Sequence, residues 1–257
     1  MLELKNITKI FLPGTQDENV LFDNLNLTIP AGQFVSIVGS NGSGKTTLLN
    51  LICSSLQPDG GTILFDGRDI TKLKQHKRAR FIGRVMQDPK SGTCPSLTIL
   101  ENMALADNKN RPYGLGRAIN KKRVDYYKSL LQKCGIGLEN RLSAVVGTLS
   151  GGQRQALALV IANMNDIKLL ILDEHTAALD PKSSETVMRI TDDFIREKQV
   201  TAVMVTHNLR FAVQYGTRLL MMHEGKFVLD LEGSNKANAS VDTLLDKFNS
   251  ISIESGN

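Results

Sequence analysis

The sequence predicts an α/β fold built around a mostly parallel sheet, and three observations support this prediction. The apolar run 34–38 is typical of a buried strand, and it leads through a glycine-rich loop into a helix that begins near Thr47. A second apolar run, 169–172, ends in two carboxylates, as expected of a parallel strand that delivers acids at its carboxyl edge. After residue 148, strand and helix patterns alternate, which is typical of βαβ units.

The loop after the first of these strands carries a complete phosphate-binding pattern, Gly39-Ser40-Asn41-Gly42-Ser43-Gly44-Lys45-Thr46. Its glycines allow a tight turn, so that backbone N–H groups and the helix N-terminus face an anion. Lys45 brings a positive charge toward the β and γ phosphates, Thr46 offers its hydroxyl to Mg²⁺, and Thr47 completes the binding set. An ordinary glycine-rich turn is the alternative, but the strand-loop-helix context disfavours it. The predicted ligand is therefore a nucleoside triphosphate with Mg²⁺.

The paired acids Asp173 and Glu174 follow the second apolar run. Asp173 is expected to hold the Mg²⁺ shell, and Glu174 is expected to polarise the attacking water as a general base. The structural alternative is a core strand followed by a solvated acidic turn. The phosphate-binding loop elsewhere in the chain favours the catalytic interpretation.

The segment Leu149-Ser150-Gly151-Gly152-Gln153 opens a helical stretch, 154–164. It places a serine and two glycines at a helix N-terminus, an arrangement that binds anions, far from the Gly39 loop in sequence. The pentapeptide matches the signature of ATP-binding cassette (ABC) ATPases letter for letter, and the chain resembles that family over nearly its whole length. The resemblance implies that Ser150, Gly151, Gly152 and Gln153 cover the γ-phosphate of an ATP held by a second cassette, packed head to tail.

Further matches follow in the family's order. Gln87 resembles the glutamine that senses Mg²⁺ and the partner domain. Asp180 ends a run, Ala177-Ala178-Leu179-Asp180, that resembles the D-loop. His207 resembles the switch histidine that contacts the γ-phosphate, and Phe11 resembles the aromatic residue that stacks on adenine.

Three of these matches have structural alternatives. A lone histidine after a β-branched strand is often a strand-end or core residue, and an isolated aromatic near a strand end usually packs. His207 follows the strand-like run 201–205, downstream of the acidic strand and an intervening helix, which favours the functional role. The prediction for Gln87 rests entirely on its place between loop and signature.

Two departures from the family pattern stand out. His175 occupies the place where most relatives have proline after the glutamate. It either fills the turn or, as a neutral imidazole, shifts the basicity of Glu174. Ala156 and the run 160–162 replace arginines that many relatives carry after the signature, which removes any contact that those arginines make.

Composition agrees with these predictions. A chain of 257 residues can form one α/β domain with a substantial core. No apolar run approaches the roughly 18 to 20 residues needed to cross a bilayer, and 1–5 begins a strand rather than a signal peptide, so a soluble protein is expected. The cysteines, Cys53, Cys94 and Cys134, lack paired spacing, which predicts buried thiols in a reducing cytoplasm.

The net charge of +5 comes largely from two basic clusters. They comprise Lys72, Lys74, Lys77, Arg78, Arg80 and Arg84, and then Lys121, Lys122 and Arg123. Neither cluster shows the aromatic interleaving of single-strand binders. They are therefore expected to be solvated or membrane-proximal faces, and no nucleic acid partner is predicted.

The resemblance to ABC ATPases implies a P-loop NTPase fold. It consists of a mostly parallel sheet core, an antiparallel N-terminal β subdomain with a hairpin at Asp66-Gly67, and an inserted helical subdomain. The expected divisions are residues 1–86 and 149–231 for the RecA-like core with its β subdomain, 87–148 for the helical subdomain, and 232–257 for a polar tail. Within them, helices are expected at 97–105 and 121–134, a Gly/Pro-rich separator at 110–116, and a short amphipathic piece at 241–248.

A complete cassette with neither a membrane span nor an internal repeat must find its partners elsewhere. The resemblance implies a peripheral ATPase on the cytoplasmic face of the cell membrane, docked on separate transmembrane permease subunits through the groove near Gln87. A second copy of the cassette and, indirectly, an extracytoplasmic solute-binding protein complete the expected partners. The run 173–181 resembles a bacterial importer subgroup, some of whose members are linked to aromatic amino acids. A soluble ABC ATPase acting on the ribosome or DNA is the alternative, although such relatives usually carry two cassettes or long coiled-coil insertions.

Overall fold

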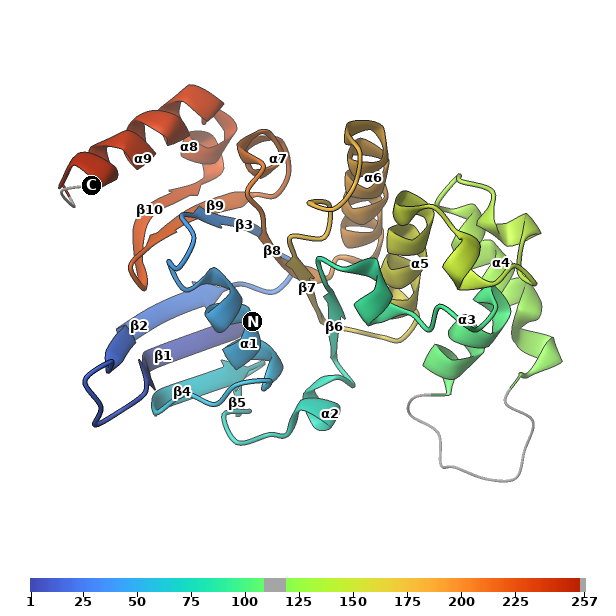
Figure 1. Ribbon diagram of the computed structural model, residues 1–257, viewed down its shortest axis with the longest axis horizontal. Coiled ribbons are helices and arrows are strands. Elements are labelled where there is room, and N and C mark those ends of the chain that lie inside the picture. The colour runs from blue at the N-terminus through green and yellow to red at the C-terminus, as the bar shows by residue number, and fades with distance from the viewer. Residues whose placement is uncertain (109–118, 255–257) are drawn as a thin grey trace. The chain divides into compact units, whose positions relative to one another are not determined.

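The computed structural model describes residues 1–108 and 119–254, which form two compact units (Figure 1). The first unit combines Met1–Ala79 with Gln199–Asn257, and the second is the continuous stretch Arg80–Lys198. The subdomain boundaries expected at residues 87 and 148 divide the chain differently and stay a prediction. The expected separator at 110–116 lies outside the described residues.

The strands of the first unit form two sets (Figure 1). The antiparallel set has the order β2-β1-β4-β5, and the second set has the order β10-β9-β3-β8, in which β3 runs parallel to both β8 and β9. The strands are β1 (Leu2–Phe11), β2 (Asn19–Ile29), β3 (Phe34–Gly39), β4 (Gly60–Phe65), β5 (Arg68–Asp69), β8 (Thr201–Val205), β9 (Arg218–His223) and β10 (Lys226–Glu232). The turn at Asp66-Gly67 joins β4 to β5, as expected.

The helices of the first unit follow the buried strand β3. All six residues of β3 are buried, which is typical of a parallel strand covered on both faces. The phosphate-loop helix follows directly and buries most of its residues, among them Leu48, Leu49 and Ile52. The helices are α1 (Lys45–Cys53), α2 (Gln75–Arg78), α7 (Leu209–Gln214), α8 (Gly233–Ala237) and α9 (Val241–Glu254).

The C-terminal segment contains more structure than the sequence suggested. The amphipathic piece expected at 241–248 continues to Glu254 in α9, and α8 precedes it. Leu244 and Ile251 are buried in a cluster with residues of β3, α7 and β9, and Phe248 packs against that cluster. These three residues are spaced four and three apart, so they lie on one face of the helix. The expected piece already contained Leu244 and Phe248, and the polar residues that follow it gave no indication that the apolar face continues to Ile251.

Arg78 contradicts the expectation of a solvated basic cluster, because its side chain is completely buried. Its guanidinium donates five hydrogen bonds to backbone carbonyls at 2.6–3.1 Å, those of Leu51, Ile52, Ile70, Thr71 and Leu73. Burial lowers the pKa of Arg78 to about 10, so the group stays charged at neutral pH. Two of the acceptors lie in the last turn of α1, where a cation also interacts favourably with the negative end of the helix dipole. Arg78 therefore anchors the end of α1 opposite the phosphate loop.

The second unit pairs two parallel strands and surrounds them with helices (Figure 1). Its elements are β6 (Ile82–Val85), β7 (Leu169–Asp173), α3 (Ile99–Asp107), α4 (Val124–Gln132), α5 (Gly151–Asn163) and α6 (Pro181–Lys198), with short 3₁₀ helices at Pro89–Gly92, Lys121–Arg123, Leu138–Asn140 and Val146–Thr148. Helix α5 packs against α3, α4 and α6, which makes it the centre of the unit. The helices expected at 97–105, 121–134 and 154–164 correspond to α3, α4 and α5 with small shifts at their ends.

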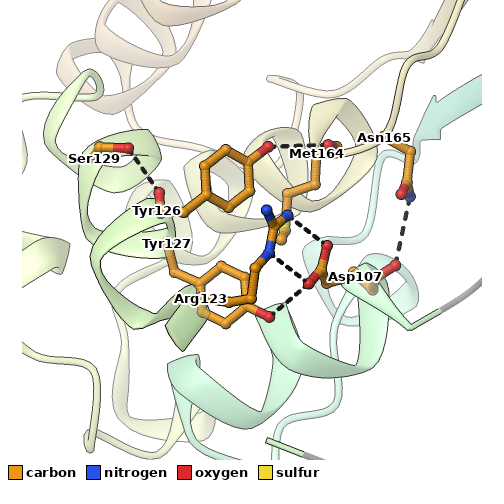
Figure 2. A network of polar contacts seen from close by, with 8 residues as sticks. Asp107, Arg123, Tyr126, Tyr127, Ser129, Met164 and Asn165 are labelled. Carbon is orange, nitrogen blue, oxygen red and sulfur yellow. Dashed lines mark hydrogen bonds and ion pairs between the residues drawn. The ribbon is translucent and has the colours of Figure 1, made fainter. Parts of the chain in front are cut away.

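A polar network around Asp107 joins α3 to the start of α4 (Figure 2). The Asp107 carboxylate accepts two hydrogen bonds from Arg123, at 2.9 and 2.8 Å, and a third from the Tyr127 hydroxyl at 3.0 Å. Arg123 also lies 4.0 Å over the Tyr126 ring, whose hydroxyl donates to the Met164 carbonyl. Arg123 thus belongs to a structural ion pair rather than to the solvated face expected from the sequence.

Asp107→Asn is expected to lower the free energy of unfolding by about 2 kcal/mol, because it removes a bidentate, charge-assisted pair and weakens the acceptor of a buried Tyr127 hydroxyl. Urea unfolding followed by circular dichroism measures the change. Asp125→Asn, on the exposed side of α4, is the matched control and should leave stability within about 0.5 kcal/mol of the parent. Equal stability of the two variants would contradict the importance of the network.

The cysteines follow the sequence prediction only in part. All three are free thiols; Cys53 and Cys134 are buried, whereas Cys94 is half-buried. Burial raises the pKa of Cys134 to about 12. Across the described ranges, 1–108 and 119–254, no helix has both the length and the apolar character needed to span a bilayer.

Candidate functional site

The phosphate loop lies between β3 and α1, as predicted. Gly44 precedes the helix as its N-cap residue with φ of 104°, a left-handed conformation that glycine adopts without strain. A Cβ atom at this position would lie 2.7 Å from the Phe22 ring, so a side chain is excluded by space as well. Asn41, Gly42 and Thr46 are exposed, which leaves the surface of the loop accessible.

Lys45 is buried by the loop that it belongs to. Its ammonium group donates to the carbonyl oxygens of Gly39 at 2.8 Å and Ser40 at 2.7 Å, and it lies 3.4 Å from the Ser43 hydroxyl. The first two acceptors are neutral carbonyl dipoles, whereas phosphate oxygens would offer full negative charge to the same ammonium. The loop thereby holds a cation beside the N-terminus of α1, where an anion is favoured.

His207 emerges at the same sheet edge as the phosphate loop. Strands β3 and β8 are parallel neighbours with Ile37 opposite Val205, so their carboxyl ends meet there. The Thr206 amide donates to the Ile37 carbonyl at 3.2 Å, and the Asn208 side chain caps α7. His207 is exposed between these anchored neighbours, in a position suited to contact a phosphate held by the loop.

Phe11 lies at the end of β1, opposite Asn19 of β2. Its ring is 37% exposed, and the Lys9 ammonium lies 5.6 Å from the ring centroid. An exposed aromatic face can stack on a planar base. This exposure keeps the adenine-stacking role of Phe11 open as a prediction.

The second unit holds the paired acids and Gln87. Strands β6 and β7 are parallel with Val85 opposite Leu172, so Gln87 and the acids leave the sheet at one edge. Glu174 adopts φ of 48°, which costs a residue with a side chain about 1 kcal/mol. Its carbonyl accepts a hydrogen bond from the Ala177 amide at 2.9 Å, which closes the turn. Backbone strain of this kind is concentrated at functional sites.

The structure also corrects the prediction that Arg84 belongs to a solvated basic cluster. Its guanidinium donates to the Asp173 carboxylate at 2.8 Å, and the two side chains are only 15% and 13% exposed. Arg84 therefore belongs to the predicted metal-binding edge instead of a solvated face. The strand-like run 81–85 is the one signal that could have indicated this contact, because it puts Arg84 on a strand that ends beside the acids.

The signature segment forms the N-terminus of α5. Ser150 and Gln153 cap the helix reciprocally, because each side chain accepts a hydrogen bond from the other residue's backbone amide. A Cβ atom on Gly152 would lie 2.9 Å from the Ser183 side chain of α6, so glycine permits the close approach of these helices. Helix capping and helix packing thus account for Ser150, Gly152 and Gln153. Ser150 and Gly151 are exposed.

Two further residues connect the signature helix and the D-loop-like run to their surroundings. Gln155, which sequence reasoning missed, is completely buried and donates to the Met86 carbonyl at 3.0 Å, next to Gln87. Asp180 accepts a hydrogen bond from the Ser183 amide at 3.0 Å at the start of α6. Hydrogen bonding to the Ser183 side chain, and then to its backbone amide, holds the pKa of Asp180 below its usual value.

His175 is a buried, neutral residue of the turn after Glu174. Its Nε2 lies 3.1 Å from the Thr191 hydroxyl, which itself donates to the Val187 carbonyl at 2.8 Å. The hydroxyl therefore accepts from His175, and the ring proton resides on Nε2. Burial lowers the pKa of His175 to about 4. The structure thus supports the packing role that the sequence left as one of two alternatives.

The lowered pKa of His175 predicts a loss of stability in acid. The unfolded chain takes up this proton near pH 6.5, whereas the folded chain takes it up only near pH 4. The free energy of unfolding is therefore highest above pH 6.5 and falls by up to about 3 kcal/mol as the pH drops toward 4. Urea unfolding at several pH values measures the slope. His175→Gln should show a shallower slope than the parent over this window, and parallel slopes would contradict the prediction.

The donors proposed for the metal fit Mg²⁺. Thr46 offers a hydroxyl, Gln87 an amide oxygen and Asp173 a carboxylate, which are the hard oxygen ligands that Mg²⁺ prefers. Within residues 1–108 and 119–254, no group of three or more His, Cys, Asp and Glu residues could hold a metal ion by itself. Sites with one carboxylate are typical of Mg²⁺ that is bound together with substrate phosphates.

Comparisons with known proteins identify the family of the chain. A family model described as ABC transporter matches residues 22–177. The chain is 46% identical, over 96% of its length and 98% of the relative, to the tyrosine transport ATP-binding protein of Clostridioides difficile. It is 31% identical, over 100% of its length and 98% of the relative, to the phosphonates import ATP-binding protein PhnC of Treponema denticola. A dimeric ATP-binding cassette in a post-hydrolysis state, bound to ADP and Pi, shares its fold with a TM-score of 0.76 at 31% identity, covering 90% of this chain and 98% of that one.

The fold and the phosphate loop define a P-loop ATPase of mixed α/β architecture, which confirms the predicted fold class. The chain belongs to the ABC transporter family and is an ATP-binding, ATP-hydrolysing subunit of that kind.

Proposed function

We propose that this chain drives the import of an amino acid, with tyrosine and related aromatic amino acids as the first candidates. The observation that carries the proposal is the 46% identity to a tyrosine transport protein along almost the whole of both chains. Aromatic amino acids were also the class suggested by the run 173–181.

In the proposed cycle, Lys45 and the loop 39–47 bind the phosphates of ATP, and Phe11 stacks on the adenine. Thr46, Gln87 and Asp173 would hold Mg²⁺, which would supply positive charge to neutralise the phosphates. Glu174 accepts the proton of the attacking water, and His207 contacts the γ-phosphate. The signature residues Ser150, Gly151, Gly152 and Gln153, with Asp180, complete the site of a second copy. ATP then favours the closed, head-to-tail homodimer, because only that state makes both sets of contacts.

The permease is proposed to dock at a cavity of about 460 Å³ in the second unit. The cavity lies beside β6, the strand that leads to Gln87, and its wall includes Leu105, a large apolar side chain that is 59% exposed. Covering this side chain with a partner would remove apolar surface from water, which favours association. Docking there places the peripheral chain on the cytoplasmic face of the membrane, with a solute-binding protein contacting the permease from the other side.

Purification from native membranes tests this function. The tagged chain is extracted in mild detergent, and proteins that co-purify in stoichiometric amounts are identified by mass spectrometry. A multi-span membrane protein, and ATP-dependent uptake of labelled tyrosine after its reconstitution with the chain, would support the proposal. Ribosomal or DNA-associated partners would overturn it in favour of a soluble ABC ATPase, and uptake of a different solute would overturn the amino acid assignment.

A further inference from the structure

Arg84 occupies an unusual position, because this one residue takes part in two features of the second unit. On one side, its Nη2 atom donates to Asp173 Oδ2 at 2.8 Å. On the other side, Arg84 lines the cavity of about 460 Å³. A guanidinium has five N–H donors in a rigid plane, so it can bond to a carboxylate and still present donors to a second acceptor.

The ion pair with Asp173 is sheltered enough to affect metal binding. The two side chains are 15% and 13% exposed, so salt and water screen their attraction less than that of a surface pair. A positive charge that neutralises Asp173 also repels a divalent cation approaching the same carboxylate. Arg84 and Mg²⁺ therefore compete for Asp173.

The cavity is a second site at which the Arg84 guanidinium could meet an acceptor. Its wall combines small residues, including Gly83, Gly92 and Ala158, with the polar side chains of Thr93, Asn102 and Asn165. Among the described residues, none of those that line this cavity carries a carboxylate. An acidic side chain entering it would be the negative partner that the lining lacks.

We propose that Arg84 is a positioning residue that couples the cavity to the metal-binding carboxylate. With the cavity empty of acid, Arg84 holds Asp173 and weakens metal binding. A carboxylate on a partner segment in the cavity draws the guanidinium toward itself and releases Asp173 to the metal. Because coupling is reciprocal, metal and nucleotide also strengthen the binding of the acidic segment. The inference rests on the proposed function, which supplies both the nucleotide-bound metal and the partner.

The first test measures metal affinity without turnover. Mn²⁺ replaces Mg²⁺, and electron paramagnetic resonance follows free Mn²⁺ in the presence of the full chain and a non-hydrolysable ATP analogue. Arg84→Gln is expected to bind Mn²⁺ roughly tenfold more tightly than the parent, within the range usual for coupled sites. Arg84→Lys keeps the charge and should stay near the parent. Arg189→Gln, which removes an equal charge from an exposed pair with Asp193 in the same unit, is the matched control and should leave the affinity unchanged.

Unchanged or weaker Mn²⁺ binding by Arg84→Gln, with the circular dichroism spectrum of the parent, would overturn the inference. Should that variant fail to fold, Arg84→Lys combined with the second test below decides the question. Failure of the parent chain itself to bind the Mn²⁺–nucleotide complex would instead overturn the proposed function, so the two failures are distinguishable.

The second test introduces charge into the cavity through Cys94, which lines it, while Cys53 and Cys134 are buried. Methanethiosulfonate reagents attach either a sulfonate or a trimethylammonium group to this thiol. The sulfonate label should tighten Mn²⁺ binding by about fivefold relative to the cationic label, at the lower end of the range for coupled sites. This difference should disappear in Arg84→Gln. Equal affinities of the two labelled parent proteins would overturn the coupling between cavity and carboxylate.

Discussion

Glu174→Gln should lower the rate of ATP hydrolysis roughly 10²–10⁴-fold, the usual contribution of a positioned general base, while ATP affinity stays within a few-fold of the parent. The amide keeps the shape of the side chain but cannot accept the proton of the attacking water. The strained backbone at φ of 48° and the turn closed by Ala177 are expected to persist, because both involve the main chain. Phosphate release measures turnover, and titration with a fluorescent ATP analogue measures binding.

Glu185→Gln on α6 is the matched control, since it makes the same chemical change at an exposed position and should hydrolyse ATP at the parent rate. The binding titration separates lost chemistry from lost affinity. Parent-like turnover by Glu174→Gln would reject Glu174 as the base and direct attention to His207, the other titratable residue proposed to contact the γ-phosphate.

Arg78→Met should lower the free energy of unfolding by about 3–5 kcal/mol, because several buried carbonyls lose their donor at roughly 1–3 kcal/mol each. Methionine fills part of the volume but leaves the carbonyls of Leu51, Ile52 and Ile70 without the donors that they have in the parent. Because Leu51 and Ile52 belong to α1, nucleotide affinity should fall together with stability. Urea unfolding with and without ATP measures both effects.

Lys77→Met provides the comparison for this variant. Lys77 precedes Arg78 in α2 and is exposed, so its replacement removes the same charge from the same helix without disturbing a buried contact. Its unfolding free energy should stay within about 0.5 kcal/mol of the parent. Similar losses in the two variants would show that charge alone, rather than the five backbone contacts of Arg78, stabilises this region.

Local pattern was sufficient to predict the elements that form the phosphate loop and the acidic strand. Strand β3, helix α1 and strand β7 were each predicted from a contiguous run, because hydrophobic period and glycine placement are properties of neighbouring residues. The roles assigned to Glu174 and His207 stay predictions, since the fold shows which strand each residue follows but does not test their chemistry.

Two arginines, the buried Arg78 and the largely covered Arg84, show where local pattern fails. Arg84 lies 89 residues from Asp173, and Arg78 lies 26 and 27 residues from the carbonyls of Ile52 and Leu51. Nothing in a run of basic residues distinguishes a solvated side chain from one whose acceptors come from distant strands and helices. The same limit applies to α9, where three apolar residues among polar ones become a buried stripe only through contacts with β9 and α7.

The position of β3 between β8 and β9 also affects the order in which the two units fold during synthesis on the ribosome. At roughly 5–20 residues per second, the interval between synthesis of Phe34 and of His223 is about 10 to 40 s. Strands β8 and β9 are made only after the continuous unit Arg80–Lys198, so the phosphate-loop strand lacks both of its neighbours until that unit has been synthesised. The nascent chain is therefore expected to fold its second unit first, and it becomes able to hold a nucleotide only after β9 has been made.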